Sequence, residues 1–86
     1  MNDALERAVH SKIVEIAGAI GNDASGLGRE QNIPGSGLLD SAGLLELVAW
    51  IETEHGLTIP NEDLTVENLG TIEGIARYVE RARLRQ

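Results

Sequence analysis

Ser41 follows an aspartate and precedes a strongly apolar run in the stretch GLLDSAGLLELV, and three kinds of chemistry suit a serine in that place. It could cap a helix, because Ser and Asp side chains accept hydrogen bonds from free backbone N–H groups at helix N-termini. It could act as a nucleophile, which needs a general base and an oxyanion hole. It could also be the attachment point of a phosphate-linked group, because a helix N-terminus favours negative charge.

The nucleophile hypothesis fails on the residues around Ser41. The elbow motif Gly-x-Ser-x-Gly is absent, since the chain reads LDSAG there. The only possible histidine bases are His10 and His55, and His55 lies about four turns farther along the same predicted helix. Two histidines alone make no metal site. Capping and attachment both stay open at this point.

A glycine-rich stretch, GNDASGLGREQNIPGSG at positions 21–37, precedes Ser41. It is not a Walker-type phosphate loop, which needs Gly-Lys followed by Ser or Thr. It is not an EF-hand calcium loop, because the alternating oxygen ligands are missing and the twelfth position from Asp23 is Pro34. We therefore predict a flexible loop over residues 21–40, with Leu27 and Ile33 held in the core.

Apolar periodicity predicts a long helix on either side of this loop. A spacing of three and four residues predicts the first helix over 3–20, with Asn2 or Asp3 as its N-cap. The strongest helical pattern covers residues 41–55, and Gly56 suits its C-terminal end.

The C-terminal third predicts shorter elements. LTIP, at positions 57–60, indicates an extended segment stopped by its proline. A short helical segment is predicted over 61–69, and Thr71 is a suitable N-cap for a last helix over 71–83. The prediction is an all-α fold, a small four-helix bundle with three longer helices and a short third one, in a single domain over 1–86.

Size and composition favour a binding or carrier role over an enzyme. The 86 residues allow one core and little scaffold for a catalytic cleft. Cysteine is absent, so no disulfide or zinc–thiolate site stabilises the fold, and we expect a reducing, cytoplasmic location. The N-terminus lacks the apolar core of a signal peptide, and no apolar run approaches the roughly 20 residues that span a bilayer. We expect a soluble protein that is monomeric on its own.

Charge is unevenly distributed along the chain. The formal net charge of −7 argues against nucleic acid, whose phosphates would repel the protein. No Lys or Arg lies between Glu30 and Ala76, whereas the last ten residues contain four arginines. The acidic segment is either a solvated face or a docking surface for basic partners, and charge alone leaves both open.

Asp40-Ser41 and the helix after them resemble the acyl carrier proteins and peptidyl carrier domains. The similarity continues through GLLELVAWIETEHGLTIP, which ends at Ile59-Pro60, and extends to the whole chain in layout. It implies that Ser41 carries 4′-phosphopantetheine, transferred from coenzyme A by a phosphopantetheinyl transferase, and that Asp40 supports this modification. The terminal thiol of the arm would hold an acyl or aminoacyl group as a thioester, and the protein itself would be non-catalytic.

The resemblance also implies a partner-binding surface on the predicted helix 41–55. The candidate contact residues are Ala42, Leu44, Glu46, Leu47, Trp50 and Glu52. Ala42 stands where the family usually has Leu or Met, so part of the apolar contact is missing. Gly43 would give partners close access to the backbone, and His55 stands where Phe is common. Trp50 either packs half-buried or anchors a partner.

LLDSAG is more similar to stand-alone aminoacyl and D-alanyl carriers than to fatty-acid carriers. We therefore expect an aminoacyl group, charged by a separate ATP-dependent ligase and passed to a downstream acyltransferase. A fatty-acid or polyketide acyl carrier is the alternative within the family. An alternative of another class is a small acidic helical interaction module in which Ser41 is only a helix cap.

Overall fold

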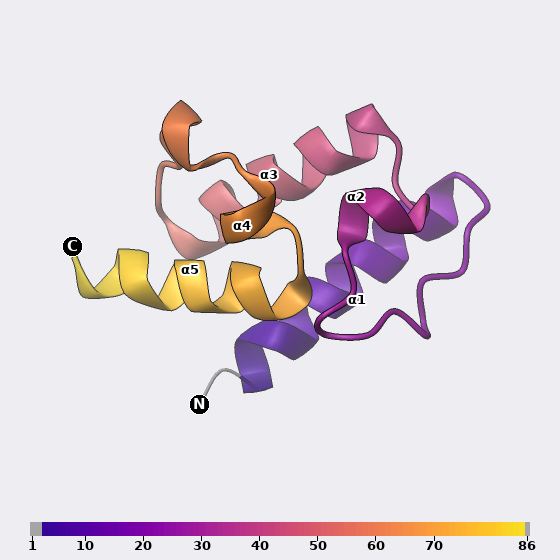
Figure 1. The fold of residues 1–86 in the computed structure, drawn as a ribbon, viewed down its shortest axis with the longest axis horizontal. Helices are drawn as coiled ribbons and strands as arrows, with labels where there is room; N and C mark the ends of the chain where they lie inside the picture. The colour runs from indigo at the N-terminus through magenta and orange to yellow at the C-terminus, as the bar shows by residue number, and fades with distance from the viewer. Residues whose placement is uncertain (1–2, 86) are drawn as a thin grey trace.

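The computed structural model describes residues 3–85, which form helices and turns and contain no strand. The elements in chain order are α1 (Asp3–Ala19), α2 (Ile33–Ser36), α3 (Ser41–His55), the 3₁₀ turn η1 (Asn61–Asp63), α4 (Val66–Leu69) and α5 (Ile72–Leu84) (Figure 1). The predicted all-α class is confirmed. The N-cap candidate Asn2 lies outside the described residues.

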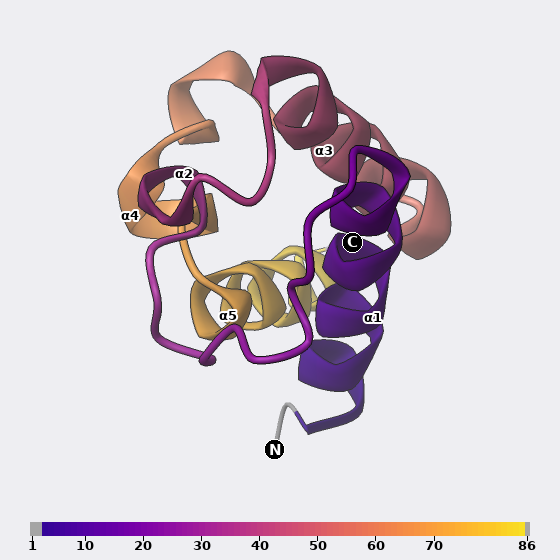
Figure 2. The same cartoon turned by 90° about the vertical axis from the view of Figure 1, so that its right-hand side faces the viewer.

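The three longer helices enclose the core, and each contributes a stripe of aliphatic side chains to it. α1 packs against both α3 and α5, and Figures 1 and 2 show α1 crossing the molecule beside them. The largest fully buried side chains are Val9, Ile13, Ile33, Ile51, Ile75 and Val79. This arrangement fixes the axis of α3, and with it the position of the helix end that carries Ser41.

The predicted loop over 21–40 is wrong in one respect, because it contains the one-turn helix α2. The Oδ1 atom of Asn32 accepts the backbone N–H of Gly35 over 2.6 Å and caps the turn. Pro34 occupies its first turn, and Gly37 ends it with a φ of 74°, a conformation that favours glycine. Four residues are too few to show an apolar period, so composition alone indicated a loop.

Buried side chains and backbone hydrogen bonds hold residues 21–40, the connector between α1 and α3, against the helices. Leu27 and Ile33 are 6% and 0% exposed, as expected from the sequence. The N–H of Ile33 donates to the carbonyl of Gly70 over 2.7 Å, and the N–H of Glu73 donates to the carbonyl of Arg29 over 2.9 Å. The connector is therefore fixed to the start of α5.

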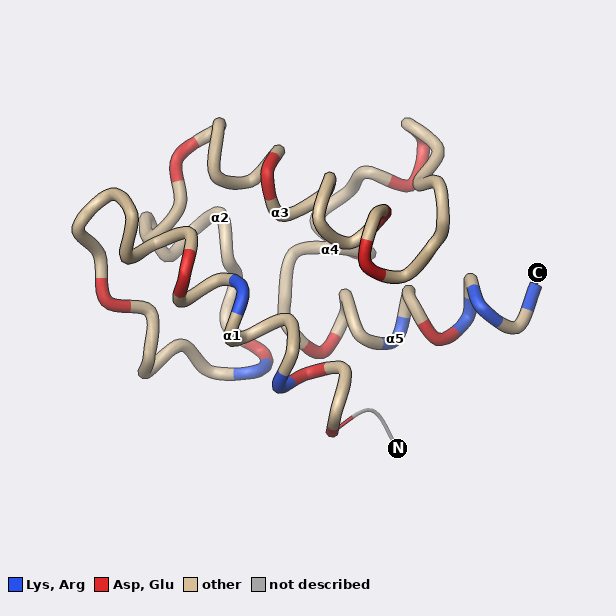
Figure 3. Tube along the Cα trace, turned by 180° about the vertical axis from the view of Figure 1, so that it is seen from behind, with Lys and Arg blue, Asp and Glu red and all other residues tan. Residues whose placement is uncertain are grey.

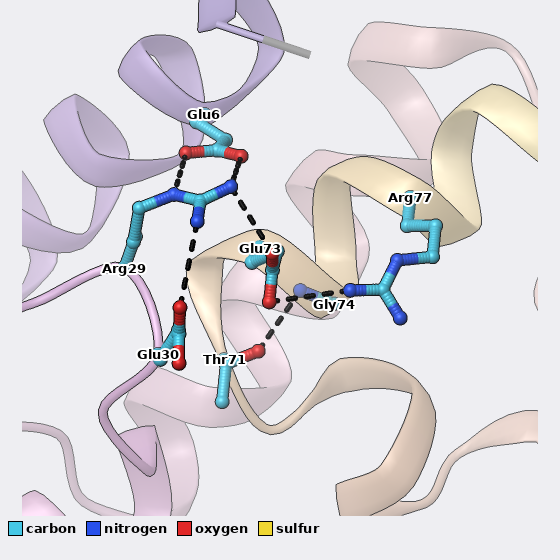
Figure 4. A network of polar contacts seen from close by, with 7 residues as sticks. All are labelled: Glu6, Arg29, Glu30, Thr71, Glu73, Gly74 and Arg77. Carbon is cyan, nitrogen blue, oxygen red and sulfur yellow. Dashed lines mark hydrogen bonds and ion pairs between the residues drawn. The ribbon is translucent and has the colours of Figure 1, made fainter. Parts of the chain in front are cut away.

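Arg29 adds an ionic cluster to these bonds (Figure 4). Its Nε and Nη2 atoms donate to the two carboxylate oxygens of Glu6 on α1, over 2.8 and 2.6 Å. Its Nη2 also lies 3.1 Å from Glu73 of α5, which in turn pairs with Arg77 over 3.2 Å. The hydrogen bond from Arg29 lowers the pKa of the Glu6 carboxyl. One side chain of the connector thus joins α1 to α5.

The segment predicted over 61–69 consists of η1 and α4, and α5 begins as the sequence predicts. The Oγ1 atom of Thr71 accepts the N–H of Gly74 over 2.9 Å, so Thr71 is the N-cap of α5. Gly56 ends α3 with a φ of 64°. Tyr78 of α5 donates its hydroxyl to Asp63 of η1 over 2.7 Å, which ties the short elements to the last helix.

Candidate functional site

The site is the first turn of α3. Asp40 has extended backbone, its Oδ1 atom accepts the N–H of Gly43 over 2.7 Å, and its carbonyl accepts the N–H of Leu44 over 2.9 Å. Asp40 is therefore the N-cap, and Ser41 is the first residue of the helix. The hypothesis that Ser41 serves only as a helix cap is wrong, because Asp40, the residue before it, is the N-cap of α3.

The Ser41 side chain is exposed and unused by the fold. Within residues 3–85 its hydroxyl makes no hydrogen bond, because Asp40 already accepts the N–H group that a capping serine would take. The hydroxyl lies at a helix N-terminus, where backbone N–H groups and the helix dipole favour an anion. A phosphate linked to this oxygen would fit: it would meet solvent on one side and the positive end of α3 on the other.

Gly43 explains how closely α3 approaches α1. It is buried, and a Cβ atom there would lie 3.1 Å from Cγ2 of Ile16 and 3.4 Å from Cβ of Leu39. The expectation that Gly43 opens the backbone to partners is therefore wrong, because this residue faces the core. Its absent side chain lets the start of α3 pack directly on α1.

The expected partner residues on α3 do not share one face. Ala42 and Glu46 are exposed, and Leu44, Trp50 and Glu52 are half-buried. Leu47 is only 3% exposed and packs in the core, so it cannot contact a partner. Ala42 and Glu46 are four residues apart and lie on the same side of the helix.

Leu45 is the exposed apolar residue that sequence reasoning missed. It is 69% exposed, one residue from Glu46 and four from Ser41. Gly43 and Leu47 mark the buried side of α3. Leu45 lies two positions from each of them, so its side chain points about 160–200° away from the buried side. The spacing of Leu45 from Gly43 and Leu47 could have predicted this exposure. The neighbouring leucines make that prediction ambiguous unless Gly43 is recognised as a residue that packs in the core.

Leu44 lines an apolar cleft beside α3 rather than the outer surface. The cleft has a volume of about 190 Å³, and Val48, Leu64, Val66 and Leu69 also line it. Leu64 and Val66 are 42% and 55% exposed, so the cleft opens to solvent between α3 and the η1–α4 segment. Leu44 is thus in a position to contact a group that enters this cleft.

Glu52 has a structural role that the sequence did not indicate. Its Oε2 atom accepts the N–H of Ile59 over 2.8 Å, and Ile59 is itself 5% exposed. The carboxylate therefore holds the extended segment that leaves α3. Glu46 makes no such contact within the described part of the chain, which leaves it as the acidic side chain of the first two turns that faces solvent.

Acidic residues occur along the connector, α3 and the segment after it, whereas basic residues gather toward the C-terminal end of α5 (Figure 3). Among residues 3–85 no group of His, Asp and Glu is arranged to hold a metal ion. Over the same residues, no helix has the length and apolar character needed to cross a membrane.

Comparison with known protein families identifies the chain. The family model described as "Phosphopantetheine attachment site" matches residues 8–79, which is most of the sequence. The chain matches no curated protein. Carrier domains of this family are non-catalytic, are modified by phosphopantetheinyl transferases and interact with partner enzymes. The chain therefore belongs to the phosphopantetheine-attachment family, to which acyl and peptidyl carrier proteins belong, and it carries 4′-phosphopantetheine as a covalent cofactor.

Proposed function

We propose that Ser41 is the attachment residue and that the protein carries an acyl group, preferably an aminoacyl group, as a thioester on the attached arm. The observation that carries this proposal is the exposed Ser41 hydroxyl, which the Asp40 cap leaves unused. The prosthetic group supplies the thiol for the thioester, in a chain that has no cysteine of its own. The protein delivers the cargo between partner enzymes.

The chain's own residues prepare Ser41 for modification. Asp40 holds the first turn of α3 through Oδ1, and its second carboxylate oxygen is available to the transferase at the serine hydroxyl. The N–H groups of the first turn favour the negative charge of the phosphodiester that results. The close packing of Gly43 on α1 keeps this helix end in one position.

Intact-mass spectrometry tests the attachment. The apo protein is incubated with coenzyme A and a phosphopantetheinyl transferase of broad specificity, and the matched variant is Ser41→Ala. We expect wild type to gain the mass of one phosphopantetheine group and the variant to gain none. No gain of mass on wild type would refute the proposal. A gain that persists in the variant would show that the arm is attached to another residue.

The aminoacyl preference rests on the LLDSAG similarity to stand-alone aminoacyl carriers. Charging the holo protein with amino acids, ATP and ligase tests this preference. If acyltransferases alone load the thiol, the fatty-acid or polyketide alternative is correct.

The partners we propose are the transferase, an ATP-dependent amino acid or acyl ligase and a downstream acyltransferase. Ala42, Leu45 and Glu46 together offer them a small apolar contact beside an acidic side chain. A partner surface with an apolar pocket and a basic rim would complement this patch. Leu45→Ser tests it: we expect slower loading at an unchanged unfolding temperature, and equal loading rates would exclude Leu45 from the contact.

A further inference from the structure

The C-terminal ends of α3 and α5 meet in a contact that the carrier function does not use. Both helices end on the same side of the molecule, away from the N-terminal end of α3 (Figure 1), which is where Ser41 lies. An Nη2 atom of Arg83 lies 2.8 Å from Nδ1 of His55, the last residue of α3. The other ring nitrogen of His55, Nε2, is buried and has no hydrogen-bond partner within the described residues. The ring also meets Trp50 edge to face, with centroids 5.6 Å apart.

This geometry requires a neutral imidazole. A guanidinium group only donates, so Nδ1 of His55 must accept, and the single ring proton then lies on Nε2. A second proton on Nδ1 would place two donors and two positive charges face to face. Protonation is therefore incompatible with the contact between His55 and Arg83.

The surroundings of the His55 ring also favour its neutral form on balance. Burial and then the positive charge of Arg83 lower the pKa of His55 from its ordinary value of 6.5, and Glu54 of α3 opposes them. The segment 56–60, which leaves the end of α3, contains no titratable side chain. The folded protein thus binds this proton less readily than the unfolded chain does. The contact therefore stabilises the fold above about pH 6.5, the pKa of His55 in the unfolded chain. This stabilisation is lost as the pH falls through the lower pKa that His55 has in the folded protein.

We propose that His55, Arg83 and Trp50 form a proton-sensitive joint between α3 and α5, closed when His55 is neutral and open when it is protonated. Opening removes the acceptor from Arg83, releases the last turn of α5 from α3 and changes the surroundings of Trp50. The joint lies at the opposite end of α3 from Ser41, and it operates whether or not the arm is attached.

Trp50 is the only tryptophan, so its fluorescence reports on the joint directly. The test follows Trp50 emission and the imidazole NMR signals of His55 through an acid titration, together with amide signals of residues 82–85. We expect all three to change with one midpoint. In His55→Phe, which keeps an apolar ring beside Trp50, the change in emission should disappear. Emission that stays constant while His55 titrates would overturn the proposal.

A matched pair of variants separates the contact from general charge effects. Arg83→Met and Arg81→Met each remove one positive charge from α5, but Arg81 lies about 200° around the helix from Arg83 and points elsewhere. We expect Arg83→Met to raise the His55 midpoint clearly more than Arg81→Met does. Equal shifts in the two variants would show that no specific contact controls the proton, and the joint would be refuted.

Discussion

Asp40 combines a structural and a chemical role, and two substitutions can separate them. Its Oδ1 atom caps α3 by accepting the N–H of Gly43 over 2.7 Å, while its charge is proposed to support the modification of Ser41. Asp40→Asn keeps an acceptor oxygen in the same place and removes the charge. Asp40→Ala removes both. The pair therefore differs in the cap alone.

The expected magnitudes follow from this single hydrogen bond. Asn caps helices about as well as Asp, so Asp40→Asn should change the free energy of unfolding by only a few tenths of a kcal/mol. Loss of the cap in Asp40→Ala costs about 1 kcal/mol, within a range of roughly 0.5–2. In a domain of this size, about 1 kcal/mol corresponds to a fall of roughly 4–8 °C in Tm.

Thermal unfolding followed by circular dichroism and the kcat/KM of phosphopantetheine loading provide the assay. We expect only Asp40→Ala to lose thermal stability, whereas both variants load at least about tenfold more slowly, which is roughly 1.4 kcal/mol in the transition state. Asp40→Asn loading at the wild-type rate would refute the role of the charge. Asp40→Ala unfolding at the wild-type temperature would refute the role of the cap.

Four further predictions concern the surroundings of the site and the last helix. Gly43→Val should destabilise the protein by about 1–3 kcal/mol, because the added carbons crowd Ile16 of α1 and the side chains of Leu39 and Asp40; an unchanged midpoint in urea would contradict this packing. Glu46→Lys should slow transfer to a partner enzyme and change stability by under about 0.5 kcal/mol, because Glu46 is exposed. Glu52→Lys should instead cost about 1–3 kcal/mol, since a buried N–H loses its acceptor; denaturation curves that coincide for the two variants would show that the Glu52 bond is unimportant. Burial, with the hydrogen bond to a carboxylate, raises the pKa of Tyr78 to about 12 from 10.0, so its contribution to stability is complete below pH 10.0 and is lost as the pH rises toward 12. Alkaline absorbance of this single tyrosine measures the value, and a midpoint near 10 in the folded protein would disprove it.

The sequence predicted the long elements well, because each carries its own local signals. The range 41–55 for α3 and the terminating Gly56 follow from periodicity and from a residue that tolerates positive φ. α2 was missed because a single turn depends on one capping side chain, Asn32, and on burial of Ile33 against the helices. Such tertiary burial leaves no local pattern.

The orientation of α3 was the least predictable feature of the site. Leucines at 44, 45 and 47 make a stripe too broad to show which of them faces the core. Packing on α1 decides it, through the missing side chain of Gly43, and turns Leu45 outward and Leu47 inward. The sequence also left open whether Asp40 or Ser41 is the N-cap of α3, because Asp and Ser are about equally favoured at that position.

The ionic cluster around Arg29 bears on the rate at which the protein unfolds. Its partners Glu6 and Glu73 come from opposite ends of the sequence, so the cluster assembles only after both have been brought together. We expect this cluster to be absent from the folding transition state, because its side chains pair only once both ends of the chain are packed, so that its loss accelerates unfolding with little effect on the folding rate. Loss of Arg29 is therefore expected to speed unfolding more than it slows folding, and salt, which screens its half-exposed charge, weakens the cluster.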